Sequence, residues 1–222
     1  MSTQSNYWDR VAHEKSFSHP LRKDWLARHL TSQARILDYG CGYGRTLAQL
    51  SDAGYGNIFG IDFSESMLSR CRREVPGSKI IRNDGHGVPL KAESLDAVLL
   101  FAVLTCIPDS NQQRQLLHAI EQVLRPGGLI YLSDLLVNDD ARNRKRYERF
   151  AKAYECYGVF ELPEGVAVRH HQKEWIEELT SSFQQFEYEH FTVTTMNRNT
   201  SAAFQYLGRK PIEDHEVSTT SR

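Results

Sequence analysis

Three glycines at alternate positions, Gly40, Gly42 and Gly44, follow directly on a short apolar run, Arg35–Leu37. Glycine has no Cβ atom, so a loop of this kind lets the backbone approach a ligand closely. A helical pattern begins at about Arg45, and the first N–H groups of that helix would point toward the same place. A strand, a tight glycine loop and a helix in this order predict an α/β domain with a ligand site where the strand ends.

Hydrophobic periodicity continues the alternation of strands and helices along the 222 residues. Further strands are predicted at Asn57–Ile61, Lys79–Arg82, Leu95–Ala102, Leu129–Ser133, Glu187–Thr195 and Ala202–Leu207. Helices are predicted at Arg45–Ser51, Glu65–Glu74, Asn111–Leu124 and Gln172–Ser182, after two amphipathic segments near Asn6–Lys15 and Leu21–Leu30. The glycines of the Arg125–Gly128 turn suit a helix C-cap. The pattern predicts a doubly wound α/β fold with a seven-stranded sheet whose last strand runs antiparallel.

The length fits one large domain better than two small ones. We expect a single domain over residues 1–210, with residues 1–30 as a helical cap, followed by a disordered tail at 211–222. The alternation breaks at residues 138–171, where a basic segment with helical spacing precedes an irregular aromatic segment that begins at Tyr154. These aromatic residues, with glycines at hinge positions, favour a lid over a small organic molecule. A surface helix followed by a loop is the alternative.

Carboxylates follow three of the predicted strands, at the edge where open α/β sheets bind ligands. Asp38 precedes the first loop glycine by two residues, and an acid there would repel a pyrophosphate but suits an ammonium group. The GxGxG spacing also differs from the GxGxxG of dinucleotide sites. Asp62 could accept both hydroxyls of a ribose without a role in the fold, or could cap the helix that begins near Ser64. Asp84 could accept from the exocyclic amine of a purine, beside the N–H of Gly85, or lie in a surface turn.

As a set, four segments resemble the class I, Rossmann-like methyltransferases that use S-adenosylmethionine. Asp38–Gly44 matches the D-x-G-x-G-x-G loop of that family, and Gly60–Leu68 is similar to its ribose segment. Leu95–Val98 and Leu124–Gly128 resemble its fourth-strand stretch and its L-k-P-G-G turn. The resemblance covers about residues 36–134. It implies S-adenosylmethionine as the cofactor, held from the methionyl end to the adenine by Asp38, Gly40, Cys41, Gly42, Gly44, Asp62, Phe63, Met67, Asp84 and Gly85, with Phe101 beneath the sulfonium.

A shared scaffold says little about the methyl acceptor. The segment after the fourth strand, Phe101–Pro108, lacks the Asn-Pro-Pro-Tyr/Phe signature of enzymes that methylate amino groups of DNA bases, which lowers the expectation of a nucleic-acid substrate. Cys106 lies in this apolar segment, and apolar surroundings raise the pKa of a thiol, so a structural role is favoured over a nucleophilic one.

Histidine is the usual general base near neutral pH, and two adjacent histidines, His170 and His171, stand where the insertion rejoins the core pattern. One of them is the leading candidate for accepting a proton from the acceptor. If both lie away from the cofactor, they would instead hold the insertion against the core, and His19 or Tyr157 would be the next candidates. Metal ligation by this pair with Glu174 is disfavoured, because no further ligand set is evident.

Composition narrows the remaining readings. The 27 basic and 28 acidic residues nearly balance, so the net charge of the chain does not attract nucleic acid or anionic lipid. The basic run Arg142–Arg149 is either solvated or contacts a phosphate, a carboxylate or an RNA backbone. No run approaches the ~20 apolar residues of a membrane span, and the start has no secretory apolar segment. Four dispersed cysteines without a CxxC pair favour a reduced, cytoplasmic setting. A small-molecule methyltransferase is the first hypothesis; an RNA or protein methyltransferase, a non-catalytic cofactor-binding module and a nicotinamide oxidoreductase are the alternatives.

Overall fold

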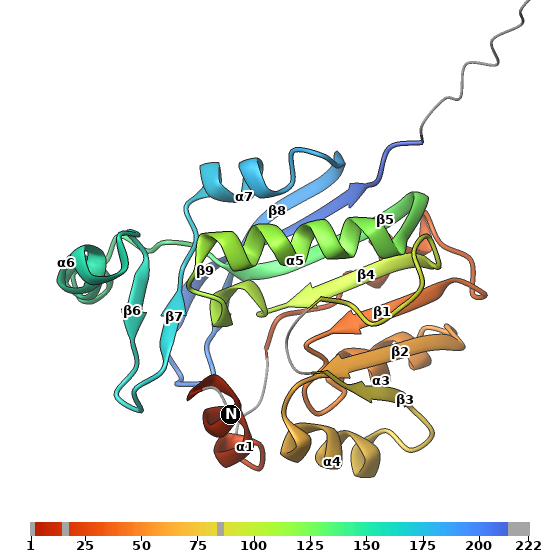
Figure 1. Cartoon of the computed structure of the whole chain (residues 1–222), viewed down its shortest axis with the longest axis horizontal. Coiled ribbons are helices and arrows are strands. Elements are labelled where there is room, and N and C mark those ends of the chain that lie inside the picture. The colour runs from red at the N-terminus through yellow and green to blue at the C-terminus, as the bar shows by residue number, and fades with distance from the viewer. Residues whose placement is uncertain (1–2, 15–17, 84–86, 213–222) are drawn as a thin grey trace, which may run out of the picture.

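A seven-stranded mixed sheet forms the centre of the protein in a computed structural model, which describes residues 3–14, 18–83 and 87–212 (Figure 1). Its strands lie in the order β3-β2-β1-β4-β5-β9-β8. β9 is antiparallel to both of its neighbours, whereas the other neighbouring strands are parallel. The predicted doubly wound sheet with an antiparallel last strand is confirmed. In chain order the strands are β1 (Arg35–Tyr39), β2 (Asn57–Asp62), β3 (Lys79–Arg82), β4 (Leu95–Phe101), β5 (Leu124–Leu135), β8 (Gln184–Thr194) and β9 (Thr200–Arg209).

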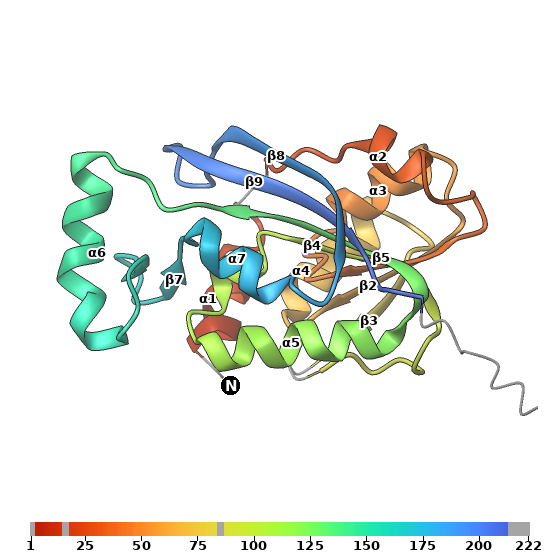
Figure 2. The ribbon, with the colours of Figure 1, turned by 90° about the horizontal axis from the view of Figure 1, so that it is seen from above.

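Helices cover both faces of the sheet (Figure 2). Successive side chains of a strand point to opposite faces, so each central strand contributes to two apolar clusters. On β4, Val98 and Leu100 join the cluster packed by α5 and α7, whereas Ala97 and Leu99 join the cluster packed by α2, α3 and α4. This arrangement explains why β4 is an almost continuous apolar run. These helices are α2 (Lys23–Ala27), α3 (Arg45–Asp52), α4 (Glu65–Glu74), α5 (Ser110–Val123) and α7 (Lys173–Leu179), and a 3-10 turn, η1 (Leu104–Cys106), follows β4.

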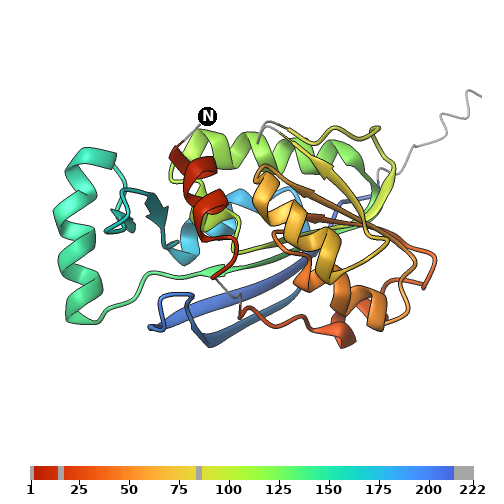
Figure 3. The ribbon, with the colours of Figure 1, turned by 90° about the horizontal axis from the view of Figure 1, so that it is seen from below.

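The remaining elements stand beyond the carboxyl ends of the strands. They are α1 (Thr3–Val11), α6 (Ala141–Tyr154) and a hairpin of β6 (Val159–Glu161) with β7 (Ala167–Arg169). Figure 3 shows α1 between α4 and this hairpin. Tyr7 and Val11 of α1 pack with Tyr147, Phe160 and Val168 in a third apolar cluster. The irregular structure predicted for 154–171 is wrong: the strands of the hairpin are too short for their periodicity to be recognised.

The turn after α5 also differs from the prediction. The helix ends at Val123 and β5 begins at once, so the following glycines do not form a helix C-cap. Instead, the Lys210 ammonium donates to the carbonyls of Glu121 and Leu124 at 2.8 and 2.9 Å. A cation thus supplies the partners that the last carbonyls of a helix lack. Gly127, with a φ of +78°, donates its N–H to the Lys210 carbonyl and fixes that lysine beside the helix.

Two other expectations concern the ends of elements and of the chain. α7 ends at Leu179 instead of Ser182, and β8 begins three residues earlier than predicted, at Gln184. Residues 213–222 of the expected tail lie outside the described residues. Within the described ranges, no helix has the length and apolar character needed to cross a membrane.

Gly44 and Gly54 provide a matched test of close packing at the start of α3. Both have a left-handed φ, +87° and +88°, which costs other residues about 1–2 kcal/mol. A Cβ at Gly44 would lie 2.6 Å from Cys71 Sγ, whereas one at Gly54 would meet nothing within 4 Å. We expect Gly44→Ala to lower the free energy of unfolding by ~1–3 kcal/mol more than Gly54→Ala, as overpacking typically does. Urea unfolding measures both, and equal losses would contradict the inferred contact.

Candidate functional site

The glycine loop turns tightly over the carboxyl end of β2. Its three glycines have φ angles of +73°, +54° and +87°, which L-amino acids with side chains rarely adopt. The N–H groups of Gly40 and Cys41 donate to the carbonyl of Ile61 at 2.7 and 2.9 Å. A Cβ at Gly40 would lie 2.6 Å from Val103 Cγ2. The loop therefore requires glycine both for its conformation and for its close approach to the residues after β4.

Asp62 connects this loop to the next helix. Its Oδ2 accepts the Gly42 N–H at 2.9 Å, and its Oδ1 accepts the Ser64 N–H at 2.8 Å. Ser64 in turn caps α4, as predicted, by accepting the Met67 N–H. Burial raises the pKa of Asp62, against the opposing effect of the N–H donors. The carboxylate thus bonds to the backbone of the loop and of the start of α4, in keeping with the alternative in which Asp62 supports the helix that begins near Ser64.

The first helix is anchored at the same corner through a residue that the sequence analysis missed. Asp9 Oδ1 accepts from the Ser64 hydroxyl at 2.6 Å and from the Ser66 N–H at 3.1 Å. Burial would raise the pKa of Asp9, but these hydrogen bonds outweigh it and lower the pKa. The anchor places Trp8 in the wall of the pocket described below. No local pattern marks Asp9, since its partners lie more than 50 residues away.

Asp38 differs from Asp62 and Asp9 in its hydrogen bonding. The side chain is buried, and its Oδ2 has no hydrogen-bond partner among the described residues. Burial, reinforced by the negative charge of Asp62 and opposed by Arg45, raises the pKa of Asp38 to about 8. A buried acceptor without a donor is costly, and an ammonium group would satisfy it. This geometry fits the methionyl end of S-adenosylmethionine, as the resemblance implies.

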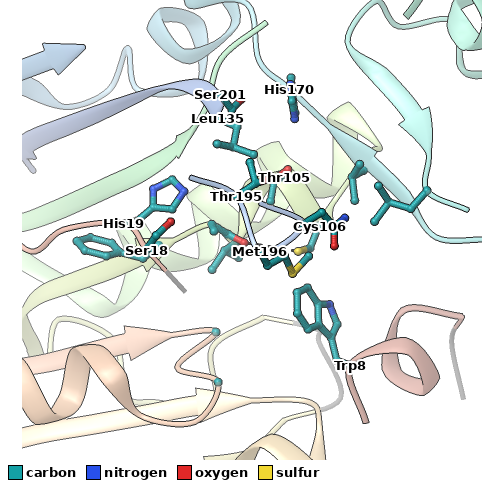
Figure 4. A pocket seen from close by; sticks show the side chains of 18 of the residues that line it. Trp8, Ser18, His19, Thr105, Cys106, Leu135, His170, Thr195, Met196 and Ser201 are labelled. Carbon is teal, nitrogen blue, oxygen red and sulfur yellow. Dashed lines mark hydrogen bonds between the residues drawn. The ribbon is translucent and has the colours of Figure 1, made fainter. Parts of the chain in front are cut away.

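A pocket opens from the glycine loop toward the insertion, and with its mouth it holds about 1220 Å³ of space not filled by atoms (Figure 4). Four regions build it: the ends of the first parallel strands, the N-terminal segment, the insertion, and the turn between β8 and β9. The lining residues are Trp8, Ser18, His19, Gly40, Gly42, Asp62, Phe63, Met67, Phe101, Ala102, Val103, Thr105, Cys106, Leu135, Arg142, Arg146, Phe160, Leu162, Val168, His170, Thr195, Met196, Asn197, Asn199 and Ser201.

Most of the residues assigned to the cofactor by resemblance meet at this pocket or directly behind it. Phe63, Met67 and Phe101 line it together with two of the loop glycines. Asp38, Cys41 and Gly44 lie in the buried strand end and loop without lining it. Asp84 and Gly85 lie outside the described residues. Cys106 also lines the pocket, and burial, its largest influence, raises the pKa of this thiol, in keeping with the inert role favoured above.

Two of the four candidate bases, His19 and His170, line the pocket. His19 Nδ1 lies 2.8 Å from Ser133 Oγ, and burial, followed by the charge of Arg45, lowers the pKa of His19 to about 4. Burial, then the charges of Arg146 and His171, lowers the pKa of His170 well below its usual value. Both imidazoles are therefore neutral at neutral pH, and Figure 4 shows them on different sides of the pocket.

Hydrogen bonds assign the tautomer of His170. The Tyr147 hydroxyl accepts the Asn138 N–H at 3.3 Å and also a side-chain hydrogen bond from Arg146. Its own proton is then donated to His170 Nδ1, 2.7 Å away. Neutral His170 consequently carries its proton on Nε2. In this state it offers a ligand a hydrogen-bond donor and is not a proton acceptor.

His171 and Tyr157 do not line the pocket. His171 is fully buried, with Nε2 3.1 Å from the Gln113 amide nitrogen and Nδ1 3.1 Å from the Leu135 carbonyl. Burial and the charge of Arg169 lower its pKa to about 3. Tyr157 is exposed and packs on Tyr147. This placement disfavours both as bases and matches the alternative in which His171 holds the insertion against the core.

Two parts of the pocket lie outside the candidate residues of the sequence analysis. Arg142 and Arg146 line the pocket, although a basic run of this kind is usually solvated. The turn between β8 and β9 contributes Thr195 and Met196, which stand at the end of the predicted strand Glu187–Thr195. In the described part of the chain, no group of three or more His, Cys, Asp or Glu residues could hold a metal ion.

Comparisons with known proteins identify the family of this chain. A sequence profile described as a methyltransferase domain matches residues 37–132. A ubiquinone biosynthesis O-methyltransferase from Aromatoleum aromaticum is 30% identical over 167 residues, which cover 72% of this chain and 67% of the relative. The chain belongs to the class I S-adenosylmethionine-dependent methyltransferases. The predicted family, and with it the cofactor and the class of enzyme, is confirmed.

Other relatives match over a smaller part or in fold alone. A phthiotriol/phenolphthiotriol dimycocerosates methyltransferase from Mycobacterium ulcerans is 30% identical over 107 residues, 47% of this chain but 38% of the relative. The match thus spans well under half of the length of that protein. A methyltransferase structure from Methanosarcina mazei superimposes with a TM-score of 0.79 and 22% identity, over 85% of this chain and 98% of that one.

Asp38→Asn tests the ammonium site. The substitution keeps the size of the side chain but removes the carboxyl group that would ionise to pair with the ammonium group, so we expect S-adenosylhomocysteine to bind about 10- to 100-fold more weakly, within the range for a hydrogen bond to a charged group. Isothermal titration calorimetry measures the affinity. Asp52→Asn, an exposed position at the end of α3, removes the same charge as a control and should leave binding unchanged. Equal affinities for the two variants would contradict the assignment of Asp38.

Proposed function

We propose that the protein transfers a methyl group from S-adenosylmethionine to a small organic acceptor bound in the pocket. One observation carries this proposal: the pocket runs from the glycine loop into a mainly apolar chamber closed by the N-terminal segment, the insertion and the β8–β9 turn. Such a chamber suits a small molecule better than a strand of RNA or a protein surface. The names of the two sequence relatives, both methyltransferases of small-molecule biosynthesis, support the same class.

The residues of the chain would bind and orient both ligands and exclude water. Asp38 and the glycine loop would hold the methionyl part of the cofactor, Asp62 its ribose, and Phe63 with Met67 its base. When bound, this cofactor supplies an electrophilic methyl group on a sulfonium. Trp8, Phe160 and Met196 would surround the acceptor and keep water from the transfer, in which positioning and desolvation are the main contributions of the protein. Residues 138–171 would serve as the lid.

His19 would accept the proton of an acceptor hydroxyl or ammonium group. In the tautomer with Nδ1–H donating to Ser133 Oγ, the lone pair of Nε2 is free for a proton. A hydroxyl group would lose its proton to Nε2 during the transfer, whereas an ammonium group would lose a proton to Nε2 before its nitrogen could attack. His170 is unsuited to this role because the Tyr147 hydroxyl holds its Nδ1 as an acceptor. The cytoplasmic setting stays a prediction.

The class of acceptor can be read from the destination of the methyl group. Wild-type protein with S-adenosylmethionine carrying a deuterated methyl group is added to a cell extract, which is then divided into small-molecule, RNA and protein fractions. We expect deuterium in the small-molecule fraction by mass spectrometry. The Asp38→Asn variant controls for background. Label found only in RNA or protein would refute a small-molecule acceptor.

His19→Gln tests the proton acceptor with the acceptor so identified. Loss of a general base typically lowers turnover ~10²–10⁴-fold. We expect a fall in kcat of this order with unchanged affinity for S-adenosylhomocysteine, whereas His118→Gln, on the exposed side of α5, should have no effect.

Because the pKa of His19 is lowered to about 4, its imidazole is already unprotonated between pH 6 and pH 8. Protonation of this residue should therefore reduce the rate only as the pH falls toward about 4. A variant with normal kcat would remove His19 from the mechanism.

A further inference from the structure

Two cations face the pocket at its far end from the glycine loop. Arg142 and Arg146 stand one turn apart on α6, and both line the pocket. Neither forms a salt bridge with a carboxylate in the described ranges of the chain, whereas arginines on α4 and α5 do. The negative charge of Asp140, at the N-cap of α6, attracts both guanidinium groups without forming an ion pair with either of them. The insertion therefore brings net positive charge to a chamber that is otherwise mainly apolar.

Arg146 is held in place although its charge is not matched. Its guanidinium carbon lies 3.5 Å from the centroid of the Phe160 ring, a cation–π contact that fixes the plane of the group. The Nε atom is buried and has no hydrogen-bond partner in the described residues. Burial lowers the pKa of Arg146, against the favourable contact with Tyr147. Arg146 is half-buried, and its buried, unused Nε–H donor would gain a partner if an anion bound to the guanidinium.

His170 adds a neutral donor on the same side of the chamber. Its Nδ1 accepts from Tyr147, which also contacts Arg146, so Nε2–H is the group left for a ligand. Arg142 and Arg146 both lower the pKa of His170, which keeps it neutral beside them. Hydrogen bonds thus link Arg146 to Tyr147 and Tyr147 to His170, so the three side chains hold one another in orientation.

We propose that this cluster binds an oxyanion of the methyl acceptor, a carboxylate or a phosphate, with Arg146 as the main contact and Arg142 and His170 beside it. The inference rests on the proposed function. A guanidinium offers two parallel N–H donors that match the two oxygens of either group, and such charge-assisted bonds are strong in a pocket of low polarity. The apolar remainder of the lining requires that the rest of the acceptor be apolar. The acceptor is accordingly an apolar organic acid or phosphate whose methylated atom lies toward His19.

The competing interpretation is that Arg146 serves the fold alone, by stacking on Phe160. Arg144 gives a matched control, because it lies on the same helix but is exposed and does not line the pocket. Arg146→Gln and Arg144→Gln each remove one positive charge from α6. Only the first should change the affinity for an anionic ligand if the cluster is a binding site.

The test uses protein saturated with S-adenosylhomocysteine and three probes, 3-(4-hydroxyphenyl)propanoate, its neutral amide, and 4-hydroxyphenyl phosphate, titrated by calorimetry. We expect at least one anionic probe to bind about 10-fold or more tightly than the amide, in line with a charge-assisted pair. Arg146→Gln should abolish this preference, while Arg144→Gln retains it. The carboxylate and phosphate arms show which oxyanion the cluster favours. If Arg146→Gln does not fold, Arg142→Gln, whose side chain is exposed, should weaken the anionic probe in the same comparison.

The outcomes separate this inference from the proposed function. Failure of both anionic probes to bind more tightly than the amide, or equal effects of Arg146→Gln and Arg144→Gln, would each overturn the oxyanion site while the cofactor still binds. Failure of S-adenosylhomocysteine itself to bind the wild-type protein would overturn the proposed function and, with it, this inference.

Discussion

The carboxylate of Asp62 is the bond on which the cofactor end of the structure depends. It accepts one N–H from the glycine loop and one from the residue that caps α4, and so it joins the turn after β1 to the turn after β2. Asp9 extends the connection to α1 through the Ser64 hydroxyl. Hydrogen bonds to a charged group contribute about 1.5–3 kcal/mol each. These bonds hold the loop in its left-handed conformation, and a preorganised loop of this kind lowers the entropic cost of binding.

The other end of the pocket is formed by the insertion, residues 138–171, which leaves the central sheet intact. The Val137 N–H donates to the His171 carbonyl, and the His171 N–H donates to the Leu135 carbonyl, both at 2.9 Å. The insertion therefore leaves and re-enters the core at one place, and its content does not disturb β5. Gln113 secures the re-entry point: its amide nitrogen contacts His171 and its amide oxygen accepts from Trp175 Nε1 at 2.7 Å. A buried polar network of this kind fixes the position of the lid candidate relative to the sheet.

Sequence patterns predicted the cofactor end more completely than the acceptor end, for a physical reason. The glycine loop, Asp38 and the Ser64 cap are local rules of backbone conformation and charge, which can be read within a few residues. The neighbours of His170 and His171 depend on tertiary packing. The two residues are adjacent in the chain, but His170 lines the pocket, whereas His171 is buried against Gln113 and Leu135. A pattern of two histidines cannot distinguish these environments. The basic run on α6 is a similar case, since Arg146 is turned onto Phe160 and Arg144 is exposed.

The two ends of the pocket are incomplete in opposite senses. At the glycine loop, Asp38 has an oxygen without a donor, and on the insertion, Arg146 has a nitrogen without an acceptor. A formal net charge of −1 for the whole chain conceals this polarity, which arises because folding places the end of β1 directly behind the glycine-loop end of the pocket and α6 in its lining. Both atoms are buried, although the Arg146 side chain as a whole is only half-buried, so water does not fully satisfy either atom. A cation at one end and an anion at the other would remove both costs, which is why ligands should stabilise this fold by more than their apolar contacts alone contribute.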